Sequence, residues 1–130
     1  MKKKIHSVLV LSLLFVILGS ASVKAQGGTY CDQYFRFCMA TSYAAGDSQS
    51  SSNAFYVNVS SGIHYSASFE AWTSWHAGYV WIQYGSGTFA LESYNEGSKY
   101  SNGVLSTSGI QWIDIFAQAS GGKSYVSVSW

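Results

Sequence analysis

Apolar and polar residues alternate with a period of two along most of this 130-residue chain. In the segment 63–72 every second residue is apolar and most residues between are polar, and the segments 53–60 and 123–130 repeat the pattern. A period of two is that of a β-strand with one covered face, whereas a helix would need a period of 3.6. No window beyond the first 25 residues carries a helical stripe. The alternation therefore predicts an all-β fold.

Glycine supplies the turns between these segments, because the chain has 13 glycines and no proline. Turn signals recur at Ser61-Gly62, Gly85-Ser86-Gly87, Asn95-Glu96-Gly97, Asn102-Gly103, Ser108-Gly109 and Gly121-Gly122. The strands that we expect between them are 29–40, 53–60, 63–72, 77–84, 87–94, 98–107, 110–119 and 123–130. About seven or eight short antiparallel strands predict a single β-sandwich.

Some of these segments support sharper predictions. Asn102-Gly103 favours a type I′ hairpin, since both residues accept a positive φ, and Gly121-Gly122 also has the composition of a hairpin turn. The Ser-rich segment Gly46 to Asn53 predicts a loop. Segments 78–84 and 110–119 are apolar on both faces, so we expect them to be central strands.

The first 25 residues have the parts of a secretory signal peptide. Lys2-Lys3-Lys4 precede the apolar run 8–18, and small residues lead to Val23-Lys24-Ala25. The run is about half of the roughly 20 residues that span a bilayer, so we expect no stable membrane insertion. We therefore expect a signal peptide over 1–25, secretion to the extracellular space, cell surface or periplasm, and one domain over 26–130.

Charge excludes one class of partner. The residues from 26 onward carry three cations, Arg36, Lys99 and Lys123, against six acids, which gives a net charge of −3. Nucleic-acid binding requires clustered Lys and Arg side chains that displace counterions from phosphates. Three scattered cations predict no nucleic-acid partner. The same residues hold 21 aromatic side chains, each able to bury a large apolar area, which favours a folded domain over disorder.

The two cysteines, Cys31 and Cys38, suit an oxidising compartment. Seven residues of straight strand would separate their Cα atoms by roughly 23 Å, whereas a disulfide allows at most about 7 Å. An intramolecular bond therefore requires the segment 32–37 to turn back on itself. Free thiols and an intermolecular bond are the alternatives. No Cys-x-x-Cys pair indicates redox catalysis.

The wetter faces of the predicted strands gather aromatic rings and short polar side chains. With strand 53–60 and the first strand placed beside strand 63–72, seven side chains form a candidate ligand-binding face. They are Trp72, Glu70, His64, Tyr56, Asn58, Tyr34 and Arg36. A sugar ring stacks its C–H face on Trp or Tyr while its hydroxyls bond to Asn, Glu or Arg. The alternative is that Trp72 lies near a strand end and folds over the edge of the sandwich without any ligand.

Catalytic and metal-binding patterns are weak. Glycoside hydrolysis needs two carboxyl groups that face each other about 5 to 10 Å apart. Nothing in the sequence shows such a pairing, although Glu92 and Glu96 are four residues apart. The histidines after residue 25, His64 and His76, are twelve residues apart and belong to no Cys-x-x-Cys or His-x-x-x-His motif. We therefore expect a protein that is not an enzyme and holds no metal or cofactor. A glycan-active enzyme is the alternative.

Asp114 stands in an apolar strand between Ile113 and Ile115. A buried carboxylate is costly unless it is paired, so we expect a cation such as Arg36 or Lys123 beside it. This predicts a structural role for Asp114.

The C-terminal half carries a likeness to a known family. It rests on Trp75-His76-Ala77-Gly78-Tyr79, on Tyr94 to Lys99 with Ser101, on Trp112 and Phe116 to Ser120, and on the aromatic strand Lys123 to Trp130. Over roughly 74–130 the chain resembles the lactococcin 972 family of secreted bacteriocins. The resemblance implies a small exported β-sandwich that acts on sensitive cells at the level of cell-wall synthesis. The chain departs from the family at Tyr100, where the family tends to place His, and in its additional N-terminal segment with two cysteines.

These features together predict a secreted, non-catalytic binding protein, in the first instance a bacteriocin-like antibacterial that recognises a cell-envelope component. A lectin-like carbohydrate-binding module with a glycan partner is one alternative. A structural subunit of an extracellular assembly is another. The ligand, the target cell and the oligomeric state stay open at this point.

Overall fold

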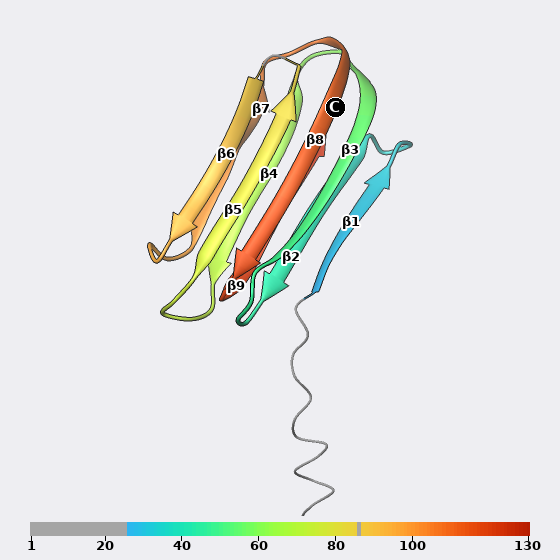
Figure 1. Cartoon of the computed structure of the whole chain (residues 1–130). Helices are drawn as coiled ribbons and strands as arrows, with labels where there is room; N and C mark the ends of the chain where they lie inside the picture. Colours follow the sequence, from blue (N-terminus) through green and yellow to red (C-terminus); the bar gives the residue numbers. More distant parts are fainter. Residues whose placement is uncertain (1–25, 86) are drawn as a thin grey trace, which may run out of the picture.

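The computed structural model describes residues 26–85 and 87–130, and the expected signal peptide, 1–25, lies outside them. The described residues form nine β-strands and no helix (Figure 1). The strands are β1 (Gln26–Asp32), β2 (Phe37–Ala44), β3 (Gln49–Val59), β4 (Ile63–Ala71), β5 (Ala77–Tyr84), β6 (Gly87–Tyr94), β7 (Lys99–Leu105), β8 (Gly109–Ser120) and β9 (Gly122–Ser129). They confirm the predicted all-β sandwich, with one or two more strands than expected.

Two antiparallel sheets make up the sandwich. A five-stranded sheet has the order β1-β2-β9-β4-β7 and a four-stranded sheet has the order β3-β8-β5-β6. Strand β2 pairs with β9, β3 with β8, β4 with β7 and β5 with β6, as they would in one long hairpin. Rolling this hairpin so that β4 also pairs with β9, and β5 with β8, closes the two sheets. This is the topology of a jelly roll, to which β1 adds an edge strand.

The N-terminal part differs from the prediction. The expected single strand 29–40 is two strands, because residues 33–36 form the turn of a hairpin between β1 and β2. This turn places Cys31 opposite Cys38, with 4.1 Å between their Cα atoms, and the predicted intramolecular disulfide is confirmed. Much of the expected loop Gly46 to Asn53 is instead the start of β3, since residues 49–53 pair with β8.

Two predicted hairpin turns are also wrong. Asn102 and Gly103 lie inside β7, opposite Ser66 and Tyr65 of β4, and a Cβ on Gly103 would lie 3.2 Å from the Tyr65 ring. Gly103 therefore makes room for that ring. Gly121, with a φ of 59°, joins β8 to β9, which belong to different sheets, so this turn crosses the sandwich.

The core between the sheets is mainly aliphatic. Its fully buried side chains include the isoleucines Ile63, Ile82, Ile113 and Ile115, together with several valines and alanines. Among the described residues, Phe69 is the only buried aromatic hydrophobic residue, although several other rings pack partly against the core. Most of the aromatic content therefore lies on the outer surfaces.

Strands β5 and β8 are the two inner strands of the four-stranded sheet, which confirms the prediction for 78–84 and 110–119. Both were expected to be central because they are apolar on two faces. A two-layer sandwich covers only one face of each sheet, so the second apolar face of these strands is the outer one. No helix within the described ranges is long and apolar enough to cross a membrane.

Candidate functional site

Five aromatic side chains cover the outer face of the four-stranded sheet, and we call them the aromatic face. They are Tyr56 on β3, Tyr79 and Trp81 on β5, and Trp112 and Phe116 on β8. Cross-strand register brings them together, because Tyr56 lies opposite Trp112, and Trp81 lies opposite Phe116. Alternation along the strands directs their neighbours in sequence, such as Ile113 and Ile115, into the core.

The rings of the aromatic face form two groups of contacting rings, Tyr56 with Trp112 and Tyr79 with Trp81 and Phe116. The Tyr56 and Trp112 centroids are 4.4 Å apart, and those of Trp81 and Phe116 are 5.8 Å apart. Tyr79 lies 6.2 Å from Phe116 and 6.4 Å from Trp81. Trp112 and Tyr56 nevertheless leave 45% and 69% of their surfaces exposed, which is a large apolar area for residues on a monomer's surface.

Two polar atoms on this face lack a partner. Trp81 Nε1 and Asp114 Oδ1 are shielded from solvent, and neither makes a hydrogen bond with any described residue. The cations expected beside Asp114 are elsewhere: Lys123 belongs to β9 in the other sheet and Arg36 to the β1–β2 turn. Desolvation raises the pKa of Asp114 above its ordinary value of 3.8. The face thus holds one unused donor and one unused acceptor beside its rings.

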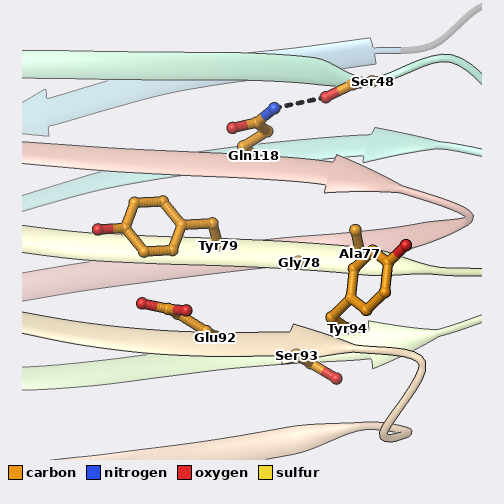
Figure 2. Close-up of a pocket in the computed structure, with 8 residues that line it drawn as sticks. All are labelled: Ser48, Ala77, Gly78, Tyr79, Glu92, Ser93, Tyr94 and Gln118. Atoms are coloured by element: carbon orange, nitrogen blue, oxygen red, sulfur yellow. Dashed lines mark hydrogen bonds between the residues drawn. The ribbon is translucent and has the colours of Figure 1, made fainter.

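A pocket opens at one end of the aromatic face, with a volume of about 210 Å³ (Figure 2). It is lined by Ser48, Ala77, Gly78, Tyr79, Glu92, Ser93, Tyr94 and Gln118. Small Ala77 lies opposite Tyr94 on one side and Ser120 on the other, which leaves a hollow between larger side chains. Figure 2 shows the rings of Tyr79 and Tyr94 on either side of Gly78. Tyr79 therefore belongs both to the pocket and to the aromatic face.

The floor of the pocket is tightly packed. A Cβ on Gly78 would lie 2.0 Å from the Phe69 ring, so only glycine fits above that ring. Beside it, buried His76 accepts a hydrogen bond at Nε2 from the Gly97 amide (2.8 Å) and approaches the Thr73 carbonyl through Nδ1 (2.7 Å). These bonds require the neutral imidazole with its proton on Nδ1. His76 thereby connects the loop before β5 to the loop after β6.

The segments behind the lactococcin-like resemblance converge on this pocket. Ala77 to Tyr79 pair with Tyr94 to Glu92 on one side and with Ser120 to Gln118 on the other. Trp75 also contacts Tyr94, with 5.9 Å between ring centroids. Residues that are distant in sequence within the resemblance therefore surround one site.

The charge of the four-stranded sheet is entirely acidic. Its strands contain no Lys or Arg, and they carry two carboxylates, Glu92 and Asp114. Register places these carboxylates two strands and four residues apart, roughly 17 Å from a strand spacing of about 4.8 Å and a rise of about 3.4 Å per residue. This separation exceeds the approximately 5 to 10 Å of a glycosidase pair. Within the part of the chain that the structure describes, no three His, Cys, Asp or Glu side chains form a metal-binding group.

The seven residues predicted from sequence do not form one face. His64 and Glu70 are exposed on the outer side of β4, and Trp72 follows that strand, with Nε1 donating to Glu70 Oε1 at 3.0 Å. These three share a face of the five-stranded sheet, as expected, although His64 lies at the far end of the strand. The Trp72 ring lies 6.1 Å from Tyr43 of β2, so it folds back across the sheet.

The other four residues are elsewhere. Tyr56 and Asn58 lie on β3, and strand 53–60 is therefore not a neighbour of 63–72 but belongs to the opposite sheet. Tyr34 and Arg36 lie in the β1–β2 turn, where Tyr34 is 88% exposed and the Arg36 carbonyl accepts a hydrogen bond from the Trp130 amide. The expected pairing of strands 53–60 and 63–72 was wrong, because β3 and β4 are consecutive in sequence but belong to different sheets.

Sequence reasoning missed Tyr79, Trp81, Trp112 and Phe116. Their two-sided apolar pattern predicts central strands but does not show which side is the outer one. The signal that could have identified them is the ring content of one side: Tyr79 and Trp81 share one side of β5, whereas Val80 and Ile82 share the other. In a two-layer sandwich, the side with rings is the one suited to partial exposure.

No protein family matches this sequence, and no curated protein does. The solved structures that resemble this chain include one described as TmCBM61 in complex with β-1,4-galactotriose, at 9% identity and a TM-score of 0.35. That alignment covers 83% of this chain and 86% of the other. The function proposed below depends on this chain's own residues.

Proposed function

We propose that this protein is a non-catalytic carbohydrate-binding module whose ligand lies along the aromatic face. The observation that carries the proposal is a pair of adjacent exposed rings, since Tyr56 and Trp112 leave 69% and 45% of their surfaces open with 4.4 Å between their centroids. Sugar rings present an apolar C–H face that stacks on aromatic rings, and hydroxyls that both donate and accept.

Charge narrows the class of glycan. The charged side chains on the strands of the four-stranded sheet are all carboxylates. They would repel the negative charges of uronic acids and sulfated sugars. Neutral sugars and amino sugars meet no such repulsion. The expected ligand is therefore a neutral or amine-bearing polysaccharide.

A pull-down with insoluble polysaccharides tests this proposal. We expect the purified protein to bind at least one neutral or amino-sugar polymer and to leave uronate-rich and sulfated polymers unbound. Failure to bind any neutral or amino-sugar polymer, or binding confined to acidic ones, would refute it. The variant Trp112→Ala should release the polymer that the wild type binds, which assigns binding to the aromatic face.

An antibacterial activity at the cell envelope is a second proposal. It is favoured by the convergence of Ala77 to Tyr79, Tyr94 and Gln118, all from the lactococcin-like segments, at one pocket. A bacteriocin that recognises an envelope glycan would use the same face. We expect purified protein to inhibit the growth of related bacteria, and normal growth across a broad panel would contradict this second proposal alone.

A further inference from the structure

The pocket beside the aromatic face offers mostly hydrogen-bond acceptors. Glu92 is exposed, and its carboxylate has no ion pair or hydrogen bond among the described residues. Gln118 donates from Nε2 to Ser48 Oγ at 2.6 Å, and in Figure 2 this bond turns its carbonyl oxygen away from Ser48. The Ser93 hydroxyl is already committed to the Gly97 carbonyl at 2.6 Å. A ligand group that donates several hydrogen bonds would suit the remaining oxygens.

The walls and the charge of the pocket restrict that group further. The rings of Tyr79 and Tyr94 stand on either side, and aromatic faces attract cations that lie within about 6 Å of the centroid. The nearest strands supply no Lys or Arg to neutralise Glu92. Tyr79 lies opposite Glu92 on one side and Gln118 on the other, so the carboxylate and the amide flank its ring. A primary ammonium has three donors and a positive charge, which match the Glu92 carboxylate and the neighbouring ring.

We propose that this pocket binds the protonated amine of an amino sugar, as the specificity-determining subsite of the glycan on the aromatic face. The inference rests on the proposed carbohydrate-binding function. A volume of about 210 Å³ equals roughly seven water molecules at about 30 Å³ each, which suits a single sugar ring. Tyr79 joins the pocket to Trp81 and Phe116, so a ring seated here continues onto the aromatic face.

The test is an NMR titration of the ¹⁵N-labelled protein with glucosamine, N-acetylglucosamine and glucose, observed at the Gly78 and Glu92 amides. A charge-assisted contact is worth about tenfold in affinity, so we expect glucosamine to bind about ten times more tightly than the other two sugars. Glu92→Gln should abolish this preference. Glu70→Gln removes the same charge from the opposite sheet and should preserve it.

Four results would overturn the inference or separate it from the proposed function. Equal binding of glucosamine and N-acetylglucosamine, or a preference that persists in Glu92→Gln, refutes an amine subsite at Glu92. Binding of Nα-acetyl-lysine amide as tight as that of glucosamine refutes the sugar assignment in favour of a peptide amine. Selective glucosamine binding at Gly78 without polysaccharide binding that depends on Trp112 would refute the proposed function and leave the amine preference intact.

Discussion

Trp112 offers the sharpest quantitative test of the aromatic face. A Trp side chain presents up to about 250 Å² of surface, and the 45% of it that is exposed at Trp112 corresponds to roughly 110 Å². A sugar ring stacked on one side would cover about half of this, and at about 25 cal/mol per Å² the contact contributes about 1.4 kcal/mol. Trp112→Ala should therefore weaken glycan binding about tenfold. The substitution also removes the contact between the Trp112 and Tyr56 rings and should lower the free energy of unfolding, so binding is compared at a temperature at which the variant is folded.

Trp72→Ala is the matched control. Trp72 is 43% exposed, nearly the same as Trp112, but it lies on the five-stranded sheet. Affinity electrophoresis in gels with and without the bound polysaccharide measures both variants against the wild type. The reasoning would be refuted by an unchanged Trp112→Ala, and an affinity loss confined to Trp72→Ala would move the site to the opposite face.

Further predictions concern stability. Gly78→Ala should lower the free energy of unfolding, measured by urea denaturation, by about 1 to 3 kcal/mol, because the added Cβ would overlap the Phe69 ring. Gly28→Ala is the control, since nothing lies within 4 Å of the added Cβ and the variant should be as stable as the wild type. Equal stability of the two variants would contradict this prediction. The double variant Cys31→Ser/Cys38→Ser should lower the free energy of unfolding by roughly 2 to 3 kcal/mol, as expected for the short loop that the disulfide closes. A melting temperature equal to that of the wild type would contradict this prediction. Asp114→Asn should raise the free energy of unfolding at neutral pH by about 0.5 kcal/mol, because it removes a desolvated charge whose Oδ1 has no hydrogen-bond partner among the described residues. The raised pKa of Asp114 means that the folded state holds this proton more tightly than the unfolded state does. The stability advantage of the variant should therefore vanish as pH falls below about 3.8. A difference in stability that persists below this pH would show that the burial of the Asp114 charge is not its cause.

The strands could be predicted from the sequence because their signal is local. Alternation in 63–72 and 123–130 reports which residues face the core, and the structure gives strands at both places. Turn signals were less reliable, since Asn102-Gly103 fits a hairpin locally but is held in β7 by pairing with β4. There, Gly103 accommodates the Tyr65 ring, a tertiary contact that no local pattern can reveal.

The site could not be predicted because it depends on which strands are neighbours. A rolled hairpin pairs β3 with β8, and this brings Tyr56 opposite Trp112, 56 residues further along the chain. The period-two pattern fixes the side of the strand on which a residue lies but not the sheet to which the strand belongs. The three residues placed together correctly, His64, Glu70 and Trp72, are those that come from one strand and its end.

The indole N–H signals of the tryptophans test the central claim most directly. Each Trp gives one resolved signal in a ¹H–¹⁵N spectrum, and Trp81 and Trp112 both belong to the aromatic face, so a sugar ring stacked on that face should shift both signals. On titration with an oligosaccharide of the bound polymer, the account predicts shifts at Trp81 and Trp112, with Trp72 unchanged. Shifts at Trp72 with both of the others unmoved would place the ligand on the five-stranded sheet and contradict the account.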